Sequence, residues 1–110
     1  MEGIELAAFT LISEVGTAKS LIMEGLYAAR SGDFETAEEK LKESRTYLNN
    51  GHKAHSGLIQ EEASGNKLEF SLILMHAEDQ MMSTETISDL VAEMIRMYKE
   101  MKEIRTLAEG

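Results

Sequence analysis

Apolar residues near the start of the chain recur at alternating intervals of four and three positions. This apolar seam consists of Ile4, Ala8, Leu11, Val15, Ala18, Ile22, Leu26 and Ala29. Residues three or four apart share one face of an α-helix, whereas strand side chains alternate with a period of two. The seam therefore predicts a helix over about residues 2–30, with the continuous apolar stripe that is typical of helical bundles.

Two further segments with helical periodicity follow the first, and each is preceded by a break that contains glycine. Gly32 fits a helix C-cap and Asp33 fits the next N-cap, so a second helix is predicted over 34–63. A second break, Ser64-Gly65-Asn66, ends that helix. The third helix is expected over about 68–107.

The composition favours an all-α chain. The 110 residues include no Pro and only 5% aromatic residues, and aromatic and β-branched residues are the ones that strands prefer. One domain is the natural expectation at this length, so residues 1–110 are predicted to form a single antiparallel three-helix bundle, an up-and-down hairpin similar to a spectrin repeat. Whether the second helix bends at Asn49-Asn50-Gly51 stays open.

The third segment carries more apolar surface than a slender bundle can bury. It is apolar on more than one face between Leu72 and Met82. Helices of about 30 to 40 residues are about 45 to 60 Å long, so the bundle should be elongated with little centre. Surplus apolar surface on such a molecule favours self-association, and closed homo-oligomers are the usual outcome.

The net charge of −9, from 20 acidic and 11 basic residues, excludes a typical nucleic-acid binder, which needs a basic face. The acidity suits a partner with a basic surface patch. The absence of Cys excludes disulfides and thiol nucleophiles and is compatible with the cytoplasm. The sequence shows neither a basic-then-apolar leader nor an 18-residue apolar run, so we expect no export and no direct membrane insertion.

The segment from Ser71 to Met82 holds the most informative pair of polar residues. His76 and Asp79 are three positions apart, so a helix places them on one face. A neutral imidazole can attack phosphorus, bind metal or move protons. The alternative for His76 is a buried side chain with a satisfied hydrogen bond.

Asp79 stands in a stripe of apolar residues, where an unpaired carboxylate is costly to bury. If the helices self-associate along this face, copies of Asp79 would meet, and protons or a hard cation would have to relieve their repulsion. Mg²⁺ accepts carboxylate oxygens in this way. The alternative is a hydrogen bond from Ser71 or Thr86 of another helix.

Two other patterns point to metals only weakly. His52 and His55 lie three apart and could ligate zinc together with a carboxylate, but no HExxH pattern is present, and two partly exposed imidazoles are favoured. The eight Met residues are better explained as flexible core filler than as a copper site.

Three stretches resemble a known family, in order and over nearly the whole chain: Gly32–Ala37, His52–Gln60 and Ser71–Met82. The third is similar to the signature Ser-Leu-Leu-Leu-Val-His-Ala-Gln-Asp-His-Leu-Met. That signature is typical of the enzyme IIA components of the lactose/cellobiose class, including diacetylchitobiose, of the bacterial sugar phosphotransferase system.

The resemblance implies a phosphotransferase component of the cytoplasm that assembles as a homotrimer, with nine helices in the bundle. It implies that His76 is the phosphorylated nucleophile and that Asp79 binds Mg²⁺ or another divalent cation on the trimer axis. The phosphate would come from the phosphocarrier HPr and pass to a cysteine of enzyme IIB during import of a lactose/cellobiose-type sugar. Gln80, one turn after His76, is expected to donate to phosphate oxygens.

The chain departs from the family pattern at three positions. Glu78 and His55 each replace a usual Gln, and Gln80 replaces a usual His. These changes leave His76 and Asp79 in place. The alternative function is a non-catalytic helical oligomerisation or regulatory module derived from the same family, and a third is a metal enzyme with His and carboxylate ligands.

Overall fold

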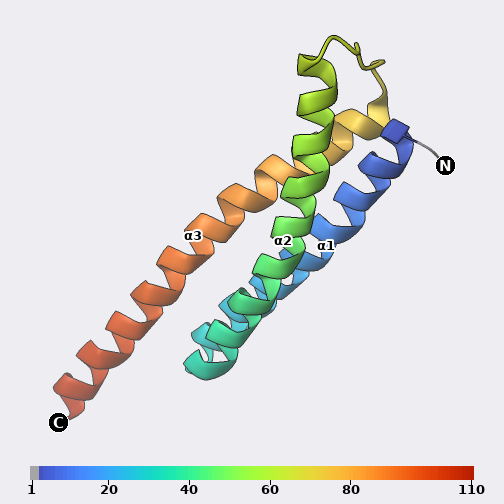
Figure 1. Cartoon of the computed structure of the whole chain (residues 1–110). Helices are drawn as coiled ribbons and strands as arrows, with labels where there is room; N and C mark the ends of the chain where they lie inside the picture. Colours follow the sequence, from blue (N-terminus) through green and yellow to red (C-terminus); the bar gives the residue numbers. More distant parts are fainter. Residues whose placement is uncertain (1–2) are drawn as a thin grey trace.

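The computed structural model describes residues 3–110 and shows three long helices that run antiparallel in chain order (Figure 1). They are α1 (Gly3–Arg30), α2 (Phe34–Ala63) and α3 (Leu72–Glu109). The molecule measures 64 × 21 × 20 Å, and its radius of gyration of 17.7 Å exceeds the roughly 13 Å of a compact domain of this size. The predicted all-α three-helix fold and its elongated shape are confirmed.

α1 is the central helix of the bundle, because it packs along both α2 and α3. Six members of its seam are fully buried, and the other two, Ile4 and Leu26, are half-buried. α2 and α3 contact each other far less, and α3 diverges from α2 toward its C-terminus (Figure 1). The seam read from the sequence is therefore the core of the fold.

The turn between α1 and α2 has the predicted caps. Gly32 adopts a φ of +87°, in the left-handed region that glycine reaches without strain. Asp33 accepts a hydrogen bond of 3.1 Å from the backbone N–H of Thr36. Hydrogen bonds from the Thr36 side chain and backbone hold the pKa of Asp33 below its usual value.

α3 begins later than the sequence suggested. The predicted start was about Leu68, but the helix starts at Leu72 because Ser71 is its N-cap, with a side chain that accepts the N–H of Leu74 at 3.1 Å. Apolar Leu68 and Phe70 had extended the periodic pattern too far toward the N-terminus. The helix ends at Glu109 rather than 107, while Glu2, the expected start of α1, lies outside the described residues.

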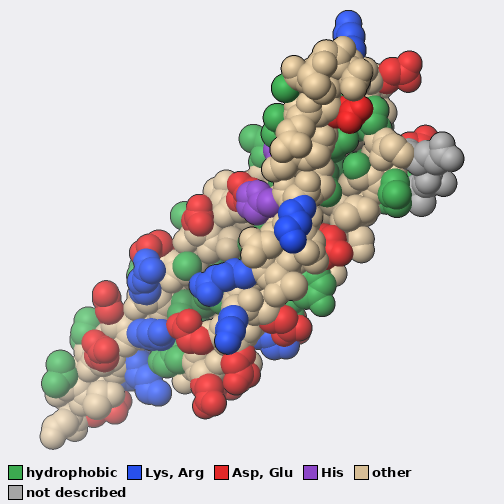
Figure 2. Space-filling view, viewed as in Figure 1, with side chains coloured by type: hydrophobic (Ala, Val, Ile, Leu, Met, Phe, Trp, Pro, Cys, Tyr) green, Lys and Arg blue, Asp and Glu red, His purple; other side chains and the backbone are tan. Residues whose placement is uncertain are grey.

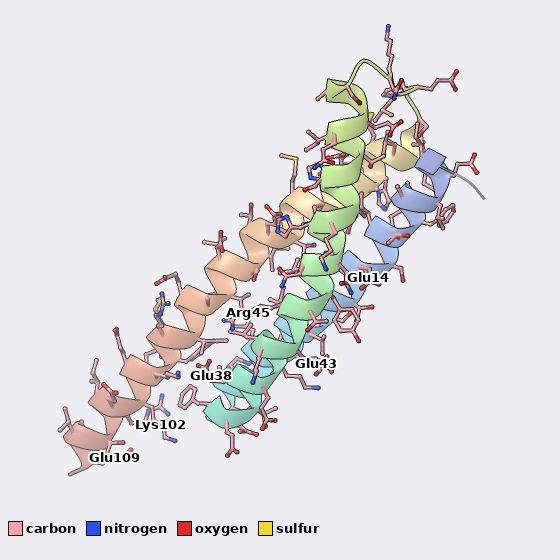
Figure 3. The ribbon with its side chains drawn as sticks, in the orientation of Figure 1. Glu14, Glu38, Glu43, Arg45, Lys102 and Glu109 are labelled. Carbon is pink, nitrogen blue, oxygen red and sulfur yellow. The ribbon has the colours of Figure 1, made fainter. Side chains whose placement is uncertain are left out.

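Gly51 marks a contact between all three helices. α2 runs without interruption from Phe34 to Ala63. A Cβ added at Gly51 would lie 3.0 Å from Val15 Cγ2 and 3.1 Å from Met81 Sδ. The missing side chain lets α2 approach both neighbours. One residue before it, the Asn50 amide donates to Glu14 at 3.1 Å and adds a polar link to α1 (Figure 3).

The bundle end that holds the α1–α2 turn is joined to α3 by charged residues. Lys99 contacts Glu38 at 2.6 Å, and the ammonium of Lys102 lies 5.4 Å from the centre of the Phe34 ring (Figure 3). On the face seen in Figure 2, acidic and basic side chains are interspersed over this half of the molecule. Such mixing gives no broad basic surface on that face for phosphate backbones.

Within the described part of the chain, α1 is the one helix long and apolar enough to cross a bilayer by length and composition alone. The core helix of a bundle meets the same criterion. α2 and α3 cover the side of α1 that includes Leu11, Val15 and Ile22, whereas Leu6, Phe9 and Tyr27 stay exposed.

Thr84 has a hydroxyl that is fully buried and has no hydrogen-bond partner among residues 3–110. An unsatisfied buried hydroxyl costs about 1–3 kcal/mol. Thr84→Val is therefore expected to raise the free energy of unfolding by about 1 kcal/mol in urea denaturation. Thr17→Val is the control: this exposed hydroxyl donates to Ser13, and its loss should change stability by less than about 0.5 kcal/mol. Loss of stability in Thr84→Val would mean that the hydroxyl is satisfied in solution.

Candidate functional site

His76 lies on the second turn of α3, close behind the cap that starts the helix. Ala77 and Met81 are buried in the core and so fix the rotation of this part of the helix. That rotation turns the imidazole outward, and His76 is exposed. The alternative of a buried histidine with a satisfied hydrogen bond is therefore wrong, and the imidazole is accessible to a partner protein.

Asp79 is also exposed, and the side chain that it hydrogen-bonds with lies on the same helix. Ser83 Oγ donates to Asp79 Oδ1 over a long 3.4 Å. The proposed alternative partners are otherwise engaged, since Ser71 caps α3 and the Thr86 hydroxyl donates to the carbonyl of Met82. Asp79 is thus not a buried carboxylate paired across the bundle.

Asp79 lies within a line of exposed apolar side chains that runs the length of α3, which we call the α3 stripe. Its apolar members are Leu72, Met75, Met82, Leu90, Met94, Met97, Met101 and Ile104, exposed by 41–78%. They recur at intervals of mostly three, four and seven residues, on the side of α3 opposite its buried residues Ala77, Met81 and Ile95. This side therefore leaves a helical seam largely exposed within residues 3–110, and Leu26 of α1 borders it near Met94 and Met97.

Gln80 follows His76 by one turn and is half-buried. Positions four apart are neighbours on a helix surface, so its amide lies on the same side as the imidazole. Its position fits the expected role as a donor to a group held on His76.

The two histidines of α2 each pair with a different glutamate of α3. His55 Nε2 lies 2.6 Å from Glu78, and His52 Nε2 lies 3.0 Å from Glu85. Both imidazoles are partly exposed, as expected. Among the residues that the structure describes, no three His, Asp or Glu side chains converge as metal ligands, so His52 and His55 do not form the zinc site considered above.

Sequence reasoning missed these pairs, although the signal was present. Glu78 and Glu85 are seven apart on α3, and two histidines three apart stand on α2. Both intervals keep residues on one helix face. The spacing alone does not show that the histidine face of α2 lies against the glutamate face of α3. Glu78 also borders an open groove between the end of α2 and the start of α3, with Leu58, Phe70 and Met75 in its wall.

Comparisons with known proteins identify both a family that matches this chain and individual relatives. Residues 6–99 match the family described as "PTS system, Lactose/Cellobiose specific IIA subunit". The chain is 38% identical over 104 residues to the lichenan-specific phosphotransferase enzyme IIA component of Bacillus subtilis strain 168, covering 94% of each chain.

Two solved structures have the same architecture. The cellobiose-specific enzyme IIA from Bacillus anthracis superposes with a TM-score of 0.90 at 37% identity, over 94% of both chains. The IIA(Chitobiose) protein of Escherichia coli, solved in complex with HPr, superposes with a TM-score of 0.79 at 32% identity, over 93% of this chain and 99% of that one.

The family match covers most of the chain, and the relatives share both its length and its three-helix fold. The chain therefore belongs to the lactose/cellobiose family of enzyme IIA components and is a phosphocarrier of the sugar phosphotransferase system.

Proposed function

We propose that His76 carries the phosphate, accepting it from HPr and passing it to a cysteine of enzyme IIB during import of a lactose/cellobiose-type sugar. The observation that supports this most directly is the state of the histidines. Of the three in the chain, His52 and His55 are each paired with a glutamate, whereas His76 is exposed without such a partner in residues 3–110. The complex of a 32% identical relative with HPr supports HPr as the donor.

The transfer is a displacement at phosphorus. The lone pair of His76 Nε2 attacks the phosphorus of phosphorylated HPr, the P–N bond to the HPr imidazole breaks, and that imidazole leaves. In the second step the thiolate of enzyme IIB attacks, and the imidazole of His76 is regenerated. Such transfers depend on positioning and charge stabilisation more than on covalent help, and the Gln80 amide is placed to donate to the phosphate oxygens. Because two proteins must reach His76 in turn, the exposure of its side chain suits the role.

We further propose that the α3 stripe is the interface of a homotrimer, a nine-helix bundle in which three copies of α3 meet around a three-fold axis. Leu72 and Met82 are exposed by 78% and 64%, and a monomer rarely leaves a helix-long apolar seam uncovered. Closed cyclic assembly would bury the seam of every chain at once. This chain would then accept phosphate in the cytoplasm as a trimer.

A trimer around the α3 stripe would bring three copies of Asp79 together. One chain offers a single carboxylate there, so a cation site could only form between chains. Three carboxylates in close contact repel one another, and a divalent cation such as Mg²⁺ accepts carboxylate oxygens and offsets the repulsion. The residue type at this position therefore fits a metal on the axis.

Asp79→Leu is expected to keep the trimer, because leucine suits the stripe and removes the repulsion. Sedimentation velocity measures the result, with and without a chelator; the wild-type assembly should weaken when the cation is removed, whereas the variant should not respond. Met82→Glu is the matched control, since it adds a carboxylate to the same stripe and should dissociate the chains. A monomeric Asp79→Leu protein would show that Asp79 does not lie on the axis.

The function is tested by incubating the purified protein with labelled phosphoenolpyruvate, enzyme I and HPr. The wild-type chain should take up label and lose it when enzyme IIB is added. A chain that stays unlabelled while it still assembles would instead support the non-catalytic oligomerisation module.

A further inference from the structure

The His55–Glu78 pair joins two of the positions at which this chain departs from the family signature. The contact of 2.6 Å links α2 to α3, and the two side chains are only 24% and 34% exposed. Because these two departures from the family signature are in direct contact, we explain them together. A role for the pair in phosphate transfer rests on the proposed function and on the proposed trimer.

The rotation of α3 separates Glu78 from the imidazole of its own chain. Successive residues of an α-helix advance by about 100° around the axis. Relative to Asp79, His76 therefore lies about 60° to one side and Glu78 about 100° to the other. Within one chain, Glu78 is on the flank that faces α2, away from His76.

A three-fold assembly around Asp79 brings these two flanks together between chains. In a cyclic trimer, one flank of each α3 faces the opposite flank of the next copy. The His76 flank of one chain then faces the Glu78 flank of its neighbour. The neighbour's His55–Glu78 pair thereby borders the space between the two α3 helices in which His76 lies.

We propose that His55 is a positioning residue, which engages Glu78 and keeps its carboxylate from opposing the phosphoryl group on His76 of the neighbouring subunit. A phosphoryl group and a carboxylate carry like charge, and their repulsion grows as they approach. His55 Nε2 contacts the Glu78 carboxylate at 2.6 Å, and this ion pair holds the carboxylate toward α2. Without His55, Glu78 is free to reach into the space between the two chains, toward the phosphoryl group.

The test compares the rate of phosphate transfer from phosphorylated HPr in His55→Gln, Glu78→Gln and the double variant. His55→Gln should slow the transfer by roughly tenfold, the effect of a like charge a few ångströms from the reacting group at a partly exposed site. Glu78→Gln and the double variant should transfer at close to the wild-type rate. A structural role for the ion pair would not give this rescue, because the double variant also lacks the pair.

His52→Gln is the matched control, because it breaks the other α2–α3 pair, with Glu85 at 3.0 Å, and should leave the rate unchanged. The inference is overturned if His55→Gln transfers at the wild-type rate, or if the double variant is as slow as His55→Gln. A wild-type chain that takes no label would overturn the proposed function and this inference together, so the two failures are distinguishable.

Mixed trimers test the placement between chains. His55→Gln chains are assembled with an excess of His76→Ala chains, so that each competent His76 has neighbours with an intact His55. Labelling per competent histidine should rise toward the wild-type rate. A rate that stays as slow as in the pure His55→Gln trimer would place the effect within one chain and overturn the proposal.

Discussion

Replacing His76 by alanine is expected to abolish phosphate uptake while leaving the chain folded. The imidazole supplies the nitrogen that forms the P–N bond, so no residual transfer should remain at this site. Its side chain is exposed, and substitutions at such positions usually change stability by less than about 0.5 kcal/mol. The measurement is the label retained after incubation with phosphoenolpyruvate, enzyme I and HPr, with circular dichroism to confirm the helical fold.

The other histidines provide the controls for this experiment. His52→Gln should take label as the wild type does, because this imidazole is engaged with Glu85. The label should also be lost in acid and kept in base, as a P–N bond requires. Equal labelling of His76→Ala and wild type would exclude His76 as the phosphate carrier.

Gly51→Leu is expected to have the largest effect on stability. The new side chain would begin 3.0 Å from Val15 Cγ2, a branched group that has little room to move in the core. Overpacking of this kind costs about 1–3 kcal/mol and here opposes the gain of about 1 kcal/mol that leucine brings to a helix. Since leucine adds three carbons beyond the Cβ that already collides, we expect an overpacking cost near the upper end of that range and a net loss of about 2 kcal/mol.

Gly57→Leu is the matched control on the same helix. A Cβ at Gly57 meets no atom within 4 Å, so only the helix propensity changes and stability should rise by up to about 1 kcal/mol. Thermal unfolding of both variants at one protein concentration measures the difference. Similar melting temperatures would show that α1 and α3 can move apart at Gly51.

The sequence by itself determined the helical class, the core seam of α1 and the two breaks between helices. These features are local: the period of the apolar residues places them on one helix face, and the residues that cap a helix lie next to it in the chain. The boundary misplaced by the most residues, the start of α3, follows the same principle. The hydrogen bond from Leu74 to Ser71 defines the boundary, whereas apolar Leu68 and Phe70 only appear to continue the helix.

Only the tertiary structure decided which faces of the helices are covered. Periodicity shows that His76 and Asp79 share a side of α3, but it does not show whether α1 buries that side. The burial of Ala77 and Met81 resolved this, because it turns His76 outward and leaves the α3 stripe exposed. Likewise, the contact between His55 and Glu78 joins residues of two different helices, and their meeting depends on how α2 is rotated against α3. Neither local spacing nor residue type specifies that rotation, since it is set by the packing of all three helices together.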